Sequence, residues 1–346
     1  MSAEVIVVVA LGTIGILAAI PMLHLLGVAL GGQPLTGSWS SLNVASAVGL
    51  VVGGMGALII HVPQIFLLQS AALGALFAAI ATVPVRSVGG GRFSVVLSAL
   101  LASAIVYVPA CTLVFFRWFD PFATHLGVID FGIALPALVG GCAVAIGAIL
   151  PELRGGGTDV RPAPTGRAAV LAFLGLWAAT TAWLLGMELA IDAISPLILI
   201  NVLIMPVVSA ATGAIVERAR QMATTAQGLA GAGLAGVAAA VPAAANLEPV
   251  LALATAVIAG VICSLLLPKG GDVVGSRLVL RTLLVGAATG IVLLGVFARD
   301  VGMFYTGQPE LLFGQVLATL MVLVVSLVVG LVLRVVGSVQ SARLPA

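Results

Sequence analysis

Charged residues are scarce in this sequence. Of its 346 residues, 8% are charged and 62% are hydrophobic, and the mean hydropathy is +1.29. Soluble domains carry roughly 25% charged residues, so this chain lacks the material for a water-exposed surface. Its 14 basic and 12 acidic residues give a formal net charge of +2, and no long basic run is present, which argues against a nucleic-acid partner.

Reactive side chains are scarce as well, with only 3 cysteines and 3 histidines. Cys111, Cys142 and Cys263 lie within apolar runs and lack the spacing of a metal site or a disulfide framework. The sequence has no HExxH motif, no nucleophile elbow and no glycine-rich phosphate loop in a suitable context. We therefore expect no enzyme activity, no cofactor and no metal site.

Long apolar runs make up most of the chain. A membrane-spanning helix needs about 20 apolar residues, and polar residues divide the chain into a series of such runs. The sequence therefore predicts an all-α polytopic protein of a cell (plasma or inner) membrane, with eleven transmembrane helices in contact with the lipid bilayer. The expected spans are 3–26, 42–60, 64–85, 93–116, 126–150, 168–189, 191–215, 226–244, 248–267, 276–298 and 310–335.

The distribution of basic residues predicts the orientation. Lys and Arg collect on the cytoplasmic side of membrane proteins. With the N-terminus outside, 12 of the 14 basic residues fall on the cytoplasmic side, and only Arg117 and Arg299 fall outside. We therefore expect an external N-terminus and a cytoplasmic C-terminus.

The chain is expected to form a single transmembrane domain, 1–346, with two halves. A Gly- and Pro-rich cytoplasmic linker at 151–167 separates a first five-helix half, 1–150, from a second, 168–298. Residues 299–346 then form a last helix and a short cytoplasmic tail. Because each half has an odd number of spans, the second is inverted relative to the first, an arrangement common in transporters.

Three stretches resemble one known family. They are RFSVVLSALLASAIVYVPACTLVFFRWFDPFATHLGVIDF, GLAGAGLAGVAAAVPAAANLEPVLALATAVIAGVICSLLL and VGMFYTGQPELLFGQVLATL. They are similar, in this order, to the fourth-to-fifth, the eighth-to-ninth and the eleventh spans of ammonium transporters (the Amt/Mep/Rh superfamily). The resemblance covers spans three to eleven, and it implies the same eleven-helix topology and a homotrimer.

The resemblance also implies a pore whose chemistry this chain lacks. In the family, an aspartate in the fifth span is followed eight residues later by a pore histidine, and a second histidine comes from the tenth span. Here the two positions are Leu138 and Leu283. On a continuous helix Leu138 would lie roughly 12 Å below Asp130, so we expect a dry, apolar bore that excludes ions. The chain's histidines are expected near span ends, where they cannot restore the pair: His24, His61 and His125.

The outer vestibule implied by the resemblance is altered too. The family's cation-holding aromatic and serine positions correspond to Phe115 and Met187, so an aromatic face remains but the hydroxyl is gone. Glu188 and Asp192 lie four residues apart at the outer end of span six. They either attract a cation electrostatically or are solvated acids at a helix end.

Asp130 begins the fifth apolar run, GVIDFGIALPALVGG. A carboxylate at the start of a helix accepts hydrogen bonds from free backbone N–H groups, and in the family this aspartate is chiefly architectural. We therefore interpret Asp130 as a structural cap rather than a substrate ligand.

Two functions remain open. The first is a divergent ammonium-transporter-family channel with an apolar pore and no histidine pair, which passes ammonia or another small neutral solute or conducts poorly. The second is a non-conducting trimeric membrane scaffold or sensor subunit. A membrane enzyme ranks third, because the sequence has no cluster of catalytic groups.

Overall fold

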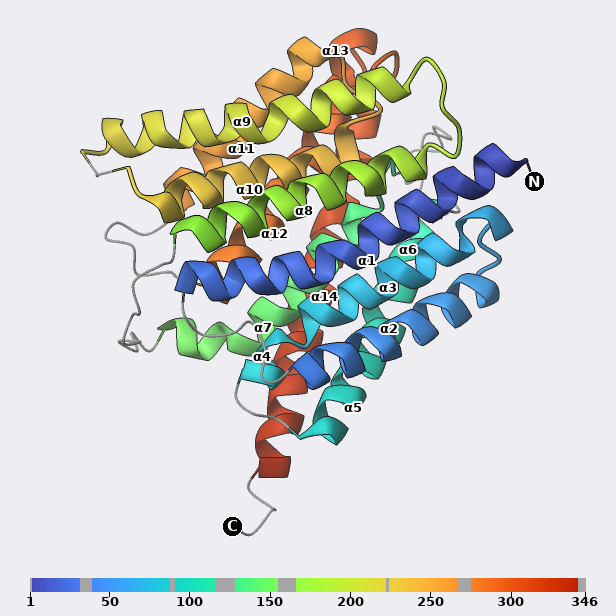
Figure 1. Cartoon of the computed structure of the whole chain (residues 1–346), viewed down its shortest axis with the longest axis vertical. Helices are drawn as coiled ribbons and strands as arrows, with labels where there is room; N and C mark the ends of the chain where they lie inside the picture. Colours follow the sequence, from blue (N-terminus) through green and yellow to red (C-terminus); the bar gives the residue numbers. More distant parts are fainter. Residues whose placement is uncertain are drawn as a thin grey trace.

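The protein is a bundle of long helices (Figure 1). The computed structural model describes residues 2–31, 39–87, 91–115, 128–154, 166–221, 224–266 and 275–341. Within these ranges, ten helices are long and apolar enough to cross a membrane, and the shorter apolar helix Leu135–Leu150 adds an eleventh segment. The predicted all-α, multi-spanning fold is confirmed.

Most helices begin and end within a few residues of the predicted spans. Those of the first part of the chain are α1 (Ala3–Gly31), α2 (Trp39–Ile59), η1 (Gln64–Phe66), α3 (Leu67–Ala81), α4 (Val83–Ser87), α5 (Arg92–Ala102), η2 (Ser103–Tyr107), α6 (Val108–Phe115), η3 (Leu135–Gly140) and α7 (Gly141–Arg154). Those of the second part are α8 (Gly166–Met187), α9 (Ser195–Ala219), α10 (Ala226–Ala243), α11 (Pro249–Leu266), α12 (Ser276–Phe297), α13 (Met303–Thr306) and α14 (Glu310–Ser341).

Three predicted spans are each built from consecutive helical pieces. The third runs through η1, α3 and α4. The fourth runs through α5, η2 and α6, and the fifth through η3 and α7; η2 and η3 are both stretches of π-helix. The linker predicted at 151–167 is partly helical, since α7 continues to Arg154 and α8 begins at Gly166. Residues 155–165 lie outside the described ranges.

The two parts of the chain repeat one packing pattern. Helices α2 and α3 pack together extensively, as do α9 and α10, while α1 and α8 lie side by side across the middle of the bundle (Figure 1). Similar pairs in each part are what two related halves would produce.

Glycines allow these helix pairs to approach closely. A Cβ atom at Gly12 would meet the Cα atom of Gly186 at 2.8 Å, which joins α1 to α8. Gly49 of α2 and Gly74 of α3 face each other, and a Cβ at either would collide with the other's carbonyl oxygen. Without a hydrophobic driving force inside lipid, such close backbone packing is a main source of helix association.

The Gly49 contact can be tested with a matched pair on one helix. Gly49→Ala should destabilise the protein by about 1–3 kcal/mol, because the new methyl group overlaps backbone atoms that cannot yield. Gly54→Ala should have little effect, since its Cβ would meet only Ala71, at 3.5 Å. Thermal unfolding in detergent measures both, and equal stability of the two variants would contradict this account.

Candidate functional site

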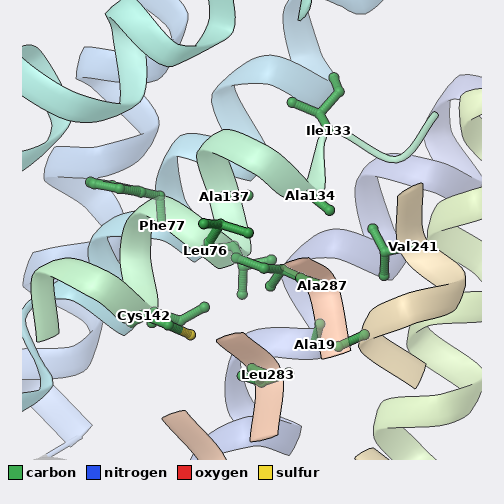
Figure 2. Packing of buried hydrophobic residues seen from close by; sticks show 14 of the residues in the cluster. Ala19, Leu76, Phe77, Ile133, Ala134, Ala137, Cys142, Val241, Leu283 and Ala287 are labelled. Carbon is green, nitrogen blue, oxygen red and sulfur yellow. The ribbon is translucent and has the colours of Figure 1, made fainter. Parts of the chain in front are cut away.

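A small cavity, which we call the central cavity, lies in the middle of the bundle. Leu138 of η3 and Leu283 of α12 both line it, and its volume is about 10 Å³, room for about one water-sized molecule. Figure 2 shows Ala19, Leu76, Val241 and Leu283 within one buried apolar cluster. The full lining is Ala19, Leu23, Leu76, Leu138, Leu176, Thr180, Trp183, Val237, Ala238, Val241 and Leu283.

The position of Leu138 depends on an irregular segment before η3. The fifth span was predicted to be helical from residue 126, but residues 128–133 are not helical and η3 begins at Leu135. The N–H groups of Phe131 and Gly132 instead donate to the carbonyls of Pro242 and Val241, at 3.1 and 3.0 Å. The backbone of this segment therefore pairs with α10 and does not form a helix. The distance of roughly 12 Å that a continuous helix would place between Asp130 and Leu138 is not expected here.

Asp130 stabilises the turn from this irregular segment into η3. Its side chain is buried, and its two carboxylate oxygens accept hydrogen bonds from the backbone N–H groups of Ala134 and Leu135, at 2.8 and 2.6 Å. The described geometry is that of a helix cap. It supports the structural interpretation of this residue.

Trp183, one of the residues that line the central cavity, carries an unpaired polar group. The indole of Trp183 on α8 is 2% exposed, and its Nε1 has no hydrogen-bond partner within the described part of the chain. The hydroxyl of Thr180 is already used, because it donates to the Leu176 carbonyl at 2.9 Å. The surface that lines the central cavity is apolar. Sequence analysis did not single out this tryptophan for the site.

A second cavity, which we call the Arg86 cavity, adjoins the first. It has a volume of about 30 Å³ and shares Leu23, Leu76 and Leu283 with the central cavity. The start of α2, the end of α4 and the first turns of α12 surround it, so it lies toward one end of the bundle. Its lining is Ile20, Leu23, His24, Leu42, Leu76, Ala79, Ile80, Val83, Arg86, Val279, Leu280 and Leu283.

His24 has a place that the sequence did not predict. It is 5% exposed within α1, lines the Arg86 cavity, and its ring lies 4.4 Å from that of Trp39. Neither it nor His61, which ends the turn after α2, is among the residues lining the central cavity. His125 lies outside the described residues.

The predicted vestibule residues lie toward the opposite end of the bundle. The ring of Phe115 is 6.0 Å from that of Phe66 in η1. Gln69 of α3 donates to the Gly186 carbonyl at 2.7 Å, which ties α3 to the end of α8, where Met187 is buried. The first residues of α3 and the last residues of α6 and α8 therefore lie together at this end of the bundle.

Glu188 and Asp192 belong to one hydrogen-bonded turn. The Ser195 hydroxyl donates to the Glu188 carboxylate at 2.6 Å and accepts from the Asp192 N–H at 3.0 Å. Partial burial raises the pKa of Glu188, the bond from Ser195 lowers it, and the nearby Asp192 carboxylate raises it further. This network is local to the α8–α9 connection.

Comparisons with known proteins identify related folds. The family model described as Ammonium Transporter Family matches residues 59–340. Mep2 of Saccharomyces cerevisiae superposes with a TM-score of 0.80 at 16% identity, covering 97% of this chain and 88% of that one. A protein described as Sensor Amt Protein gives 0.73 at 18% identity, covering 97% and 95%. Candida albicans Mep2 gives 0.78 at 16%, covering 100% and 87%. No curated protein matches the sequence significantly.

If Asp130 caps η3, substitutions at this position should reduce stability according to how many hydrogen-bond acceptors they remove. Asp130→Ala leaves two buried N–H groups without an acceptor and should cost about 1–3 kcal/mol of stability. Asp130→Asn keeps one carbonyl oxygen and should cost less. Thermal unfolding of both variants in detergent shows which of them is less stable. A fully stable alanine variant would show that the cap is dispensable.

Proposed function

The chain belongs to the ammonium transporter family, and we propose that its central cavity passes ammonia, or another neutral solute of similar size, without a histidine pair. The observation that carries the proposal is the joint lining of one cavity by Leu138 and Leu283. Leucine offers no hydrogen bond and no proton relay, so a solute must cross this point uncharged. On this proposal the protein is a channel or transporter rather than an enzyme.

Size and polarity favour ammonia among neutral solutes. About 10 Å³ accommodates one water-sized molecule, and ammonia has about that size. An ammonium ion is of similar size but carries a charge, and none of the residues that line this cavity is acidic. Removing the ion's hydration in an apolar cavity is also costly.

The resemblance to family members supports further parts of the proposal. We propose a homotrimer in the plasma or inner membrane, with the N-terminus outside and the C-terminus cytoplasmic, so the Arg86 cavity lies at the cytoplasmic end. Phe115 and Met187 then border the outer mouth. Glu188 and Asp192 either attract cations there or serve the turn that they share with Ser195.

A second candidate is the non-conducting scaffold or sensor. The observation in its favour is the small size of the two cavities along the bundle, about 10 and 30 Å³. Flux measurements separate the two functions, because only the first requires a solute to cross.

The first functional prediction concerns ammonia flux. Proteoliposomes should show no ammonium-evoked current, because a charged solute cannot cross, yet their lumen should become alkaline faster than that of protein-free liposomes after ammonium addition. Leu283→Phe fills the cavity and should reduce the rate to the protein-free value. Leu171→Phe, at a position 70% exposed on α8, is the matched control. A saturable current would refute the apolar-pore account, and protein-free rates for the wild type would favour the scaffold.

The second functional prediction restores the missing pair. Leu138→His with Leu283→His places two imidazoles on one cavity, where each can satisfy the other's donor or acceptor and relay a proton. Either single variant should do less, since one unpaired imidazole costs about 1–3 kcal/mol. Ammonium-evoked current should rise in the double variant alone. A folded double variant without current would place the obstruction elsewhere, with Met187 the first position to vary.

A further inference from the structure

Arg86 is buried at the end of α4. Its side chain is 1% exposed, and one guanidinium nitrogen, Nη2, donates to the Ala79 carbonyl of α3. The other two, Nε and Nη1, have no hydrogen-bond partner among the described residues. A guanidinium carries five N–H donors and stays protonated in proteins. Most of its donors are therefore left unused inside the protein.

An anchoring role does not explain this arrangement. Basic residues that flank a membrane span normally extend toward the interface, where the charged group stays in water. Arg86 instead folds back along its own span to reach Ala79 and lines the Arg86 cavity. Ionisable groups placed inside a membrane protein mark binding sites and pathways by default, and buried charges are as a rule paired.

The space beside the guanidinium limits what can pair with it. The Arg86 cavity has a volume of about 30 Å³, which is larger than a single water needs. Apart from Arg86 and His24, its walls are apolar. His24 is held against Trp39, with 4.4 Å between the ring centroids. A small ion of the opposite charge fits both the volume and the unused donors.

We propose that the Arg86 cavity binds one small monovalent anion, of the size of chloride or formate, through the free N–H groups of Arg86. A charge-assisted contact of this kind is among the stronger hydrogen bonds. The anion neutralises the buried guanidinium inside the Arg86 cavity. Anion binding does not depend on the passage of a neutral solute through the central cavity.

Calorimetric titration of the purified full-length protein with chloride, formate and sulfate, at constant sodium concentration, tests the proposal. Chloride and formate should bind saturably and sulfate should not, because a second negative charge would stay uncompensated inside an otherwise apolar cavity. Arg86→Gln should weaken binding by about tenfold or more, and Arg86→Lys should weaken it less. Arg92→Gln removes an exposed guanidinium at the start of α5, close in sequence, and should change nothing.

Two results would overturn the proposal: no saturable binding by the wild type, or wild-type affinity in a folded Arg86→Gln variant. If Arg86→Gln does not fold, crystals of the wild type grown in bromide decide the matter. An anomalous peak within hydrogen-bond distance of the Arg86 guanidinium supports the site. Bromide found only elsewhere, or water alone in the cavity, refutes it.

Discussion

The need to pair every backbone polar group inside the membrane is the constraint on which this structure depends. Hydrocarbon offers no hydrogen bonds, so each break in a helix must be closed by the protein itself. At three places the side-chain amide of a buried Gln or Asn binds backbone carbonyl groups of another segment. Gln69 donates to Gly186, Gln315 donates to Ile129, and Asn201 donates to both Ala244 and Leu247. Each amide links two distant segments, so the irregular joints also fix how the helices pack.

The same constraint makes buried polar side chains without a hydrogen-bond partner informative. Some buried polar side chains return a bond to their own helix, as Thr180 and Thr282 do. Several others have no partner in the described part of the chain. Among them are the Trp183 Nε1 and two nitrogens of Arg86, and both residues line cavities. A buried donor without an acceptor costs stability. For Arg86, whose group is charged, the proposed anion would supply the missing acceptor.

The fold was largely predictable from the sequence because hydropathy and span length are local properties. Predictions from local sequence patterns were wrong where contacts between segments distant in the sequence determine the structure. The start of the fifth span was wrong because Phe131 and Gly132 pair with α10, which no neighbouring residue reveals. Arg86 was taken for an ordinary cytoplasmic basic residue, since its inward turn depends on space left between α1, α2 and α12. Leu138 and Leu283, which align with the family's histidine positions, line one cavity, and their part in a pore stays a prediction.

On the proposed function, a cation that enters the two cavities meets two barriers. In the central cavity the ion loses its hydration without gaining acceptors, because leucines stand where imidazoles would offer lone pairs. In the next cavity it meets the fixed charge of Arg86, and two like charges about 4 Å apart repel by about 4 kcal/mol at an effective dielectric constant of about 20. A bound anion would relieve the second barrier but not the first. A neutral solute meets neither barrier, so selection against charge does not require the histidine pair.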